Sequence, residues 1–307
     1  VLKTRDDRYE AELAAQNTQL FIEQDKVFAL FGYVGTPTSN AAVSQITKAQ
    51  IPFFAPMTGA SSLRAPFNRL IFNVRASYND ETEYLVDRVV RIGSSRISVF
   101  YQNDAYGLSG LAGVETAMRK RGLRVEGLAT VERNSVDVEL AASRLMQQKP
   151  EVIVQISAYS SCAALVRKMR ALGYKGQFYN VSFVGAKALA DVLGEDAAGV
   201  IVSQVVPFPW SAGANPLVAE YTKMIRRIGL TPNFSSLEGY IAAKIFIEGV
   251  RRAGADISRE KLILALETIS ARNYDLGGFG VQFSSHSHEG SRYVELTVIG
   301  EDGNFRN

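Results

Sequence analysis

Apolar and polar positions along this chain follow two different periods in turn. Short apolar runs, such as residues 97–101 and 152–157, predict buried strands. Between the runs, apolar residues recur at spacings of three and four, as at Leu111, Val114 and Met118, and this spacing predicts helices with one buried stripe. Strands that alternate with helices of about 10–15 residues indicate βαβ units and therefore a parallel sheet.

The alternation extends over most of the chain. Strands are predicted near 27–31, 51–55, 70–74, 97–101, 124–130, 152–157, 177–181 and 200–206. Helices are predicted near 10–24, 39–49, 80–90, 108–121, 136–148, 160–172 and 186–193, and then near 216–228, 235–252 and 258–269 without intervening strands. Asp80 with Glu83 resembles a capping box at the start of the third of these helices.

A Pro- and Gly-rich stretch at 207–213 interrupts this alternation. With 307 residues, the chain is long enough for two domains of ordinary size. We therefore predict two lobes, one made of residues 1–77 with 211–280 and the other of residues 78–210 with 281–307. The predicted crossings lie near 75–80, 207–212 and 278–286. The sequence does not begin with Met, and residues 1–4 resemble a strand that is entered halfway.

Composition and charge argue against two classes of protein. Lys and Arg number 34 and Asp and Glu 31, so the net charge of +3 gives no basic stripe for nucleic acid. The densest basic run, residues 119–121, falls at a predicted helix end, where cations complement the helix dipole. No apolar run reaches the roughly 18 residues of a membrane span. We expect neither nucleic-acid binding nor a membrane-spanning helix.

Signatures of catalysis and metal binding are missing from the sequence. It contains no glycine-rich dinucleotide or phosphate loop, no nucleophile elbow and no zinc-protease motif. Cys162 is the only cysteine, so no internal disulfide can form, and its small neighbours predict a buried, inert thiol. His286 and His288 stand in a Ser- and Gly-rich segment that we predict to be a surface loop rather than a metal site. We expect no enzyme activity, no cofactor and no metal.

In open parallel sheets, ligands bind beyond the carboxyl ends of the strands, which directs attention to the loops that follow them. The loops are 32–38, 56–61, 102–107, 158–161 and 182–185, and they carry the hydroxyls of Thr36, Thr38, Thr58 and Ser61, the glycines Gly35 and Gly59, and the rings of Tyr33, Tyr106, Tyr159 and Phe183. Glycines and helix N-termini present backbone N–H groups to a carboxylate. Ser, Thr and Gly also cap helices and form turns, but their recurrence in several strand-end loops favours a binding site.

Several segments, taken in order, resemble a known family. They are Asp6-Asp7, the apolar runs 27–32 and 51–56, Tyr106-Gly107 after a strand and an aspartate, and Tyr159 after the strand at 152–157. The chain looks like a solute-binding protein of the leucine/isoleucine/valine-binding family, which delivers ligands to ABC transporters. The resemblance covers essentially the whole chain. It implies an α/β fold of two doubly wound, Rossmann-like lobes with a hinge, the type I periplasmic-binding-protein fold.

One part of the family pattern is missing. The usual first strand and helix, ahead of Asp6-Asp7, have no counterpart, so we expect the chain to be a piece of a longer protein whose precursor carries a signal peptide. The resemblance implies that Thr36, Thr58 and Gly59, together with Thr38, hold a ligand carboxylate. It also implies that Tyr106 and Tyr159 close over the ligand from the second lobe.

The sequence departs from the family at Ser182. Amino-acid binders of the family carry an acidic residue there, which pairs with the ligand's ammonium group. A buried ammonium without a carboxylate partner would be costly. Either Glu238 or Asp104 supplies the charge from elsewhere, or the ligand has no amine. The expected ligand is therefore a branched-chain or aliphatic amino acid, or an aromatic or other organic acid.

The resemblance implies a monomeric, periplasmic substrate-binding protein that closes around its solute by a hinge motion and presents it to a membrane permease. The alternative is a ligand-sensing regulatory domain of the same fold, of the amide-sensor or repressor-core type. A repressor would need a DNA-binding helix-turn-helix at its N-terminus. An α/β enzyme is the third possibility, and it would need a nucleophile or cofactor loop at a strand end.

Overall fold

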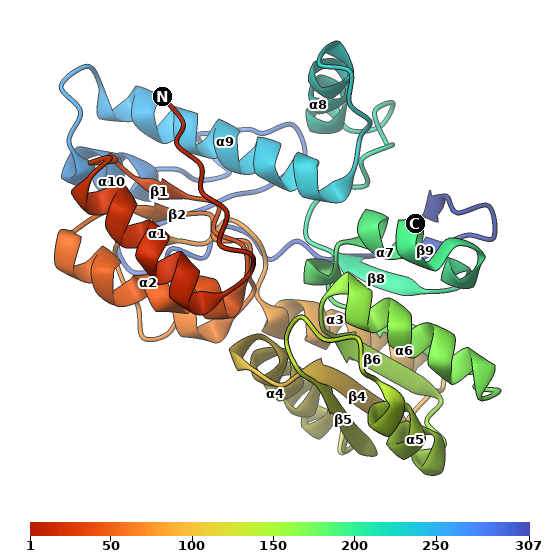
Figure 1. Cartoon of the computed structure of the whole chain (residues 1–307). Coiled ribbons are helices and arrows are strands. Elements are labelled where there is room, and N and C mark those ends of the chain that lie inside the picture. The colour runs from red at the N-terminus through yellow and green to blue at the C-terminus, as the bar shows by residue number, and fades with distance from the viewer. The chain divides into compact units, whose positions relative to one another are not determined.

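The computed structural model describes residues 1–307, which divide into two compact units (Figure 1). Unit 1 comprises Val1–Ala76 and Pro209–Tyr293, and unit 2 comprises Ser77–Phe208 and Val294–Asn307. Each unit has its own sheet with helices on both faces, so the α/β class expected from the sequence is confirmed. The chain passes between the units three times.

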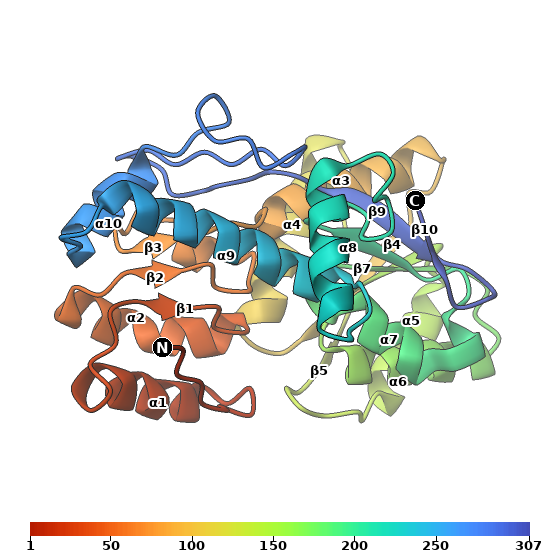
Figure 2. The same ribbon diagram turned by 90° about the horizontal axis from the view of Figure 1, so that it is seen from above.

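Unit 1 is built on a short parallel sheet in the order β1-β2-β3 (Figure 2). Its elements are α1 (Ala11–Glu23), β1 (Leu30–Phe31), α2 (Thr36–Ala49), β2 (Phe53–Phe54), the 3-10 helix η1 (Ser61–Leu63), β3 (Ile71–Phe72), α8 (Pro216–Arg227), α9 (Phe234–Ala253) and α10 (Arg259–Glu267). Helices α1 and α2 cover one face of the sheet, and α9 and α10 cover the other (Figure 1). Residues 1–7 form no strand, which differs from the expectation for residues 1–4.

Unit 2 has a seven-stranded sheet in the order β10-β9-β8-β7-β6-β4-β5. Its elements are α3 (Tyr78–Arg91), β4 (Ile97–Gln102), α4 (Ala105–Lys120), β5 (Gly127–Val131), α5 (Glu139–Gln148), β6 (Val152–Ile156), α6 (Tyr159–Ala171), β7 (Gln177–Asn180), η2 (Ser182–Val184), α7 (Ala186–Leu193), η3 (Gly194–Ala197), β8 (Ile201–Gln204), β9 (Glu295–Ile299) and β10 (Phe305–Arg306). Strands β4 to β8 are parallel, whereas β9 and β10 pair antiparallel at one edge. Helices α3 and α4 lie on one face, and α5, α6 and α7 on the other (Figure 1).

The order of the parallel strands in unit 2 reverses between β4 and β6. The chain first places β5 on one side of β4 and then β6, β7 and β8 on the other side. In a doubly wound sheet, the connections on the two sides of such a switch point leave the sheet on opposite faces, which opens a crevice at the carboxyl ends of the two strands. The residues that follow β4 and β6 are therefore the best-placed ligand contacts within this unit.

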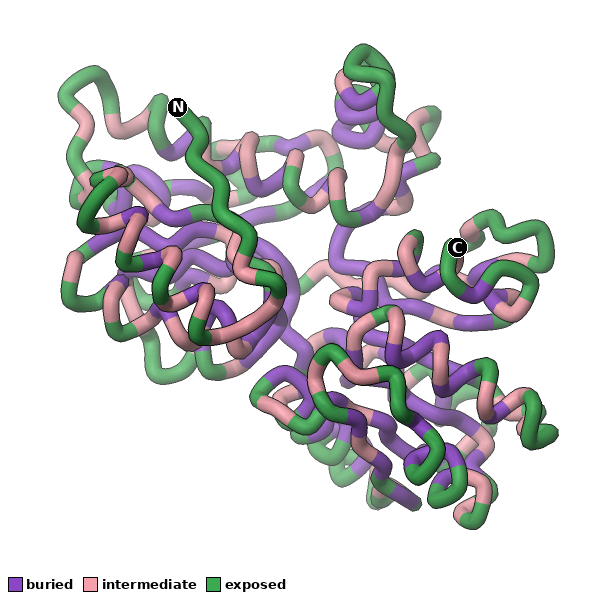
Figure 3. The backbone as a smooth tube through the Cα atoms, viewed as in Figure 1, coloured by how far each residue is buried: buried purple, intermediate pink, exposed green.

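The cores consist of the strands and the inner faces of the helices, which are purple in Figure 3. In unit 1, aromatic rings connect the sheet to α9: Phe246 of α9 packs edge-on against Phe31 and Phe54, with ring centroids 5.8 and 5.3 Å apart. Phe54 also stacks on Phe72 of the neighbouring strand, at 6.2 Å. The sheet is thus held between two helical layers by large apolar side chains, which contribute most of the burial energy.

Residues 281–293 belong to unit 1, whereas the sequence placed the third crossing near 278–286. This segment extends the pairing of β3: Asn73 N donates to His288 O at 2.9 Å, and Gly290 N donates to Asn73 O at 2.7 Å. The ring of His288 stacks on Phe72 at 3.7 Å and is 2% exposed. The expectation of a surface loop is therefore wrong for His288, although His286 is exposed. Backbone hydrogen bonds to Asn73, which is far away in the sequence, hold this segment in place, and local composition could not predict them.

The start of α3 also differs from the sequence expectation. The capping box uses Ser77 and Asp80 rather than Asp80 and Glu83, because the helix begins at Tyr78. Ser77 N donates to Asp80 Oδ2 at 3.0 Å, and Asp80 N donates to Ser77 Oγ at 3.1 Å. With this start, Glu81 is the fourth residue of the helix, and its side chain is fully buried.

Candidate functional site

In unit 1, backbone hydrogen bonds join the loops that follow β1 and β2. Met57 N donates to Tyr33 O at 2.7 Å, and Gly35 N donates to Met57 O at 3.2 Å. Gly35 has φ 98° and immediately precedes α2, and a Cβ atom there would overlap the ring of Tyr9. Both the backbone angle and the lack of space require glycine at this position. The two loops therefore act as one structure at the carboxyl end of the sheet.

The hydroxyl groups of Thr36 and Thr58, both predicted ligand contacts, meet at this junction. Their Oγ1 atoms are 2.6 Å apart, and both residues are buried, with exposed fractions of 1% and 0%. Thr58 Oγ1 also accepts a hydrogen bond from Ala60 N at 3.2 Å. Thr36 is the first residue of α2, so the pair lies beside the positive end of a helix dipole. The structure thus brings together the two residues that the sequence selected first, and their contact with a ligand stays a prediction.

Thr38 and Gly59 lie in the same two loops but have different surroundings. Thr38 Oγ1 donates to the carbonyl oxygens of Val34 and Gly35, the second at 3.1 Å. Its hydroxyl proton is therefore used within the first turn of α2, as is common for threonine near a helix start. Gly59 is buried directly after Thr58. For both residues the predicted ligand contact stays a prediction.

Tyr33, one of the predicted aromatic walls, points its hydroxyl towards α1. The hydroxyl oxygen lies 2.8 Å from Thr18 Oγ1, and the ring packs edge-on against Phe53. Burial raises the pKa of the Tyr33 hydroxyl, so the group is neutral at ordinary pH. Tyr33 therefore holds the loop after β1 to its helical layer.

Two arginines that the sequence analysis missed stabilise this end of unit 1. The side chain of Arg64 is 5% exposed, and its guanidinium donates to Ala60 O at 2.9 Å and to Arg75 O at 3.1 Å. It thereby connects the loop after β2 to the chain that follows β3. Arg75 is itself 2% exposed. An arginine inside the apolar run 70–76 was the signal in the sequence, because such a buried cation requires partners.

Glu238 of α9 is one of those partners. Its Oε1 lies 3.4 Å from Nε of Arg75, and its side chain is 16% exposed. The carboxylate therefore already balances a buried cation of its own unit, whereas the sequence analysis offered it as the partner of a ligand ammonium group. Glu238 holds Arg75 in place, and a direct contact with a ligand stays a prediction.

In unit 2, Asp104 caps α4, and Tyr106 lies in the first turn of this helix. Asp104 Oδ1 accepts hydrogen bonds from Tyr106 N and Gly107 N at 2.9 and 3.4 Å, and Oδ2 accepts one from Gln102 Nε2 at 2.6 Å. These bonds occupy the carboxylate that was the other candidate for pairing with a ligand ammonium group. Asp104 thus serves as an N-cap of α4.

Tyr106 is fully buried in an aromatic cluster. Its ring lies 5.3 Å from that of Tyr78 and 4.6 Å from that of Phe183. Tyr159, in contrast, is 42% exposed as the first residue of α6. The two tyrosines follow β4 and β6, the strands that flank the switch point of the sheet. The fold therefore puts both predicted contacts at the expected place within unit 2, one as part of the core and one as an exposed ring.

Ser182 follows β7 and contacts a carboxylate that the sequence analysis did not select. Ser182 N donates to Glu81 Oε2 at 2.8 Å, and Ser182 Oγ donates to Glu81 Oε1 at 3.0 Å. Ser203 Oγ also donates to Glu81 Oε2, at 2.5 Å. The resemblance implied an acidic residue at this position, and the structure has a serine there that is hydrogen-bonded to an acid from α3. The two residues are 101 positions apart, so no local pattern could have paired them.

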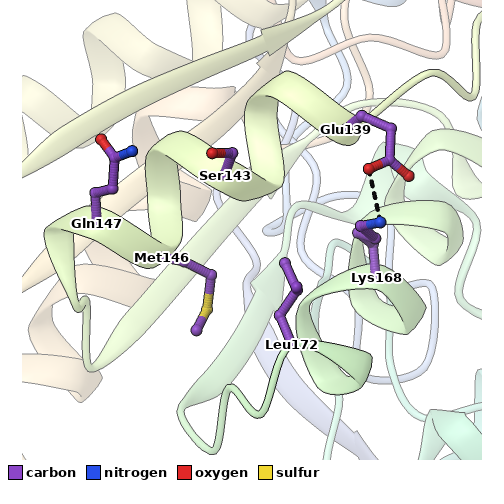
Figure 4. A pocket seen from close by; sticks show the side chains of 6 residues that line it. All are labelled: Glu139, Ser143, Met146, Gln147, Lys168 and Leu172. Carbon is purple, nitrogen blue, oxygen red and sulfur yellow. Dashed lines mark ion pairs between the residues drawn. The ribbon is translucent and has the colours of Figure 1, made fainter.

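A separate hollow of about 420 Å³ lies between α5 and α6 on unit 2 (Figure 4). It is lined by Glu139, Ser143, Met146, Gln147, Lys168 and Leu172. Its charges are paired, since Lys168 Nζ lies 2.6 Å from Glu139 Oε2. None of the predicted ligand-binding residues lines it.

The single thiol of the chain lies in the core of unit 2. Cys162 is fully buried, its thiol donates to Ser157 O at 3.5 Å, and burial raises the pKa of the thiol. No group of three or more His, Cys, Asp and Glu side chains is arranged to hold a metal ion. No helix has both the length and the apolar character needed to cross a membrane.

Two α/β units, each with polar groups where its parallel strands end, are typical of proteins that bind a ligand at the carboxyl ends of a sheet. A sequence profile of that class, described as periplasmic binding protein, matches residues 1–304. The chain belongs to the periplasmic binding protein family, whose members bind solutes. The family resemblance inferred from the sequence is therefore confirmed.

Solved structures support the type I fold. The chain is 35% identical to a possible leucine/isoleucine/valine-binding protein from Rhodopirellula baltica, with a TM-score of 0.92 over 98% of this chain and 82% of that one. A branched-chain amino acid ABC transporter protein from Thermus thermophilus with bound valine is 20% identical, with a TM-score of 0.85 over 98% of this chain and 82% of that one, and shows the same fold.

Curated relatives are more distant. The Leu/Ile/Val/Thr-binding protein of Salmonella typhimurium is 19% identical over 201 residues, which cover 64% of this chain and 54% of the relative. A Leu/Ile/Val-binding protein homolog from Brucella abortus is 25% identical over 167 residues, or 54% of this chain and 44% of the relative. The chain thus spans about half the length of the curated relatives that it matches.

Proposed function

We propose that this protein is the periplasmic substrate-binding component of an ABC transporter and that it captures a small solute bearing a carboxylate. The solute is a branched-chain or aliphatic amino acid, or an aromatic or other organic acid. The proposed capture step is a hinge movement by which the two units close over the ligand. In this role the protein acts as a monomer that presents its ligand to a membrane permease, without chemical change of the ligand.

The observation that carries this proposal is the buried hydroxyl pair of Thr36 and Thr58 at the N-terminus of α2. A hydroxyl group beside a helix N-terminus suits a carboxylate, because a hydroxyl can donate a hydrogen bond and the helix dipole favours negative charge. The names of the relatives, which bind leucine, isoleucine, valine or threonine, support the same class of ligand. The geometry in unit 2, with Tyr106 and Tyr159 following the strands at the switch point, supports a ligand at the strand ends.

The test is a thermal-shift panel of the twenty L-amino acids and of matched aliphatic and aromatic acids, followed by calorimetric titration of each compound that stabilises the protein. A ligand at a hundred times its Kd should stabilise the folded state by about 2.7 kcal/mol. Thr58→Val should weaken binding of every stabilising ligand, because the carboxylate loses a donor. Ser143→Ala, in the hollow between α5 and α6, is the matched control and should bind normally. A folded protein that binds no member of the panel would contradict the proposal.

A further inference from the structure

Arg64 is a buried arginine that closes the segment after β2 in unit 1. It follows directly on η1, and its side chain is 5% exposed. Its guanidinium donates hydrogen bonds to three backbone carbonyl oxygens, those of Thr58, Ala60 and Arg75, at 3.4, 2.9 and 3.1 Å. Nε of Arg64 also lies 3.9 Å from Glu289 Oε2. The side chain therefore turns back to the loop that precedes η1 and holds two of its carbonyl groups.

The direction of a carbonyl group determines the direction of the N–H group in the same peptide unit. In a trans peptide unit, which is planar, the C=O and N–H bonds point to opposite sides. The Thr58–Gly59 bond is trans, and Thr58 O faces the guanidinium of Arg64, so the N–H of Gly59 points away from it. By the same geometry, the bond from Arg64 to Ala60 O turns the N–H of Ser61 away. Arg64 thus orients two N–H groups of this loop without contacting them.

The N–H of Gly59 is a donor that the chain itself does not use. Gly59 is buried, and its nitrogen makes no hydrogen bond within the protein. Buried backbone N–H groups are almost always paired, so this donor indicates an acceptor from outside the chain, either a water molecule or a ligand atom. It stands next to Thr58, whose hydroxyl is paired with that of Thr36. A ligand carboxylate is the acceptor that the proposed function requires at this place.

We propose that Arg64 is a positioning residue for the ligand carboxylate: by holding the carbonyl groups of Thr58 and Ala60, it keeps the N–H of Gly59 directed at the ligand. This inference rests on the proposed binding function and adds to it a residue that does not touch the ligand. The bond to Arg75 O ties the guanidinium to the chain after β3, so the loop has its conformation before a ligand arrives. A donor that is already oriented needs less ordering on binding, which favours affinity.

The experiment compares the Kd of a carboxylate with the Kd of its primary amide, beginning with L-leucine and L-leucinamide and continuing with each carboxylate that stabilises the protein. An N–H group binds a charged acceptor more strongly than a neutral one, so the wild type should prefer the carboxylate by about tenfold or more. Arg64→Met keeps much of the volume but removes every donor, and it should reduce this preference by about tenfold. Arg64→Lys, which has one ammonium group in place of the planar fork, should also reduce the preference.

Arg259→Met is the matched control. Arg259 also donates to three backbone carbonyl oxygens, those of Val27, Phe28 and Ala49. These groups lie ahead of β1 and at the end of α2, away from the loop after β2. The loss of Arg259 should therefore lower the stability of unit 1 but leave the preference for the carboxylate unchanged.

Circular dichroism identifies the folded variants, and Arg64→Lys provides the reading if Arg64→Met does not fold. An unchanged preference in the folded Arg64 variants, or an equal loss of preference in Arg259→Met, overturns the role of Arg64 and leaves the proposed function standing. Failure of every carboxylate to bind the wild type overturns the proposed function, and the role of Arg64 with it.

Discussion

At the residue scale, single side chains join segments that are far apart in the sequence. Thr36 and Thr58 bond to each other across 22 positions, and Arg64 connects Ala60 to Arg75. In each case the groups are buried, so each hydrogen bond that is lost leaves a polar atom without its partner. The geometry of the loops after β1 and β2 therefore depends on a few polar contacts rather than on apolar packing alone.

The hydroxyl pair of Thr36 and Thr58 gives a prediction on stability. Thr58→Val should lower the free energy of unfolding by about 1–3 kcal/mol. The buried hydroxyl of Thr36 loses its hydrogen-bond partner, and the buried N–H of Ala60 loses its acceptor. The double variant with Thr36→Val should cost less than the sum of the single variants, since it removes both members of the pair. Urea unfolding of the four proteins in this cycle measures the coupling.

The matched control is Ser62→Ala. Ser62 Oγ donates to Asn40 Oδ1 at 2.9 Å on the surface and thus also joins the α2 segment to η1. Its loss should change stability by no more than about 0.5 kcal/mol, because water replaces the exposed bond. Additive effects of the two threonine substitutions would show that their hydroxyls do not interact.

At the scale of elements, α4 packs unusually close to the end of β4. A Cβ atom on Gly107 would overlap Gln102 O and would lie 2.8 Å from Gln102 C. The contact is with backbone atoms, which cannot move aside as the end of a flexible side chain could. Gly107 therefore allows α4 to begin directly after its strand, and Tyr106 takes its position from this short connection.

Two glycines in helices should respond in opposite ways to substitution by alanine. Gly107→Ala should cost about 2 kcal/mol or more, because the added methyl group forces α4 away from β4. Gly239→Ala, at an exposed position in the second turn of α9, should raise stability by about 0.5–1 kcal/mol, since no atom lies within 4 Å of the new Cβ and alanine favours the helix. Thermal unfolding of both variants against the wild type tests this contrast. Equal destabilisation of the two would mean that the close packing of α4 is not what Gly107 provides.

The end of α9 gives a prediction on pH dependence. Hydrogen bonds from Arg251 and Arg252 lower the pKa of Glu248 to about 2, against the opposing effect of its burial. Because the folded-state pKa is depressed, the contribution of Glu248 to stability is complete above its unfolded pKa of 4.5 and is lost as the pH falls towards 2. The free energy of unfolding of Glu248→Gln should therefore fall less than that of the wild type as the pH is lowered from 4.5 towards 2. Urea midpoints measured across this range give the comparison, and parallel curves for the two proteins would contradict it.

The sequence predicted the order of helices and strands well, because their apolar periods are local. Helix α7, for example, has the predicted bounds, α8 ends one residue earlier than predicted, and α6 begins and ends one residue earlier. Contacts that depend on distant segments were not predictable from such periods. The Glu81–Ser182 bond, the Arg75–Glu238 pair and the pairing of Asn73 with the segment around His288 all depend on register between strands or helices far apart in the chain.

At the scale of the whole molecule, unit 2 carries a single thiol that can report on its opening. Cys162 is fully buried on α6, against Ser157 O at the end of β6. A reagent that requires the thiolate cannot reach it while the sheet and α6 stay packed together. Because the chain has one cysteine, any signal from labelling comes from this place in unit 2.

We expect native Cys162 to react with a disulfide reagent such as DTNB several orders of magnitude more slowly than it does in denaturant, because reaction requires opening of unit 2. Ser235→Cys places a second thiol at an exposed position in unit 1 and should react at once, which checks the reagent. Immediate reaction of Cys162 in the native wild-type protein would contradict the burial described here.

The division of unit 1 into two sequence segments has a consequence for biosynthesis. Its sheet is complete by Ala76, but α9 and α10, which cover the second face, follow only after residues 77–208 have been made. At about 5–20 residues per second, the ribosome needs roughly 7–26 s for that interval. During this time Phe31 and Phe54 lack their packing partner Phe246, so the nascent chain exposes an apolar surface that is prone to aggregation. Slow translation or a shortage of chaperones should therefore lower the yield of this protein before any defect in the finished fold does.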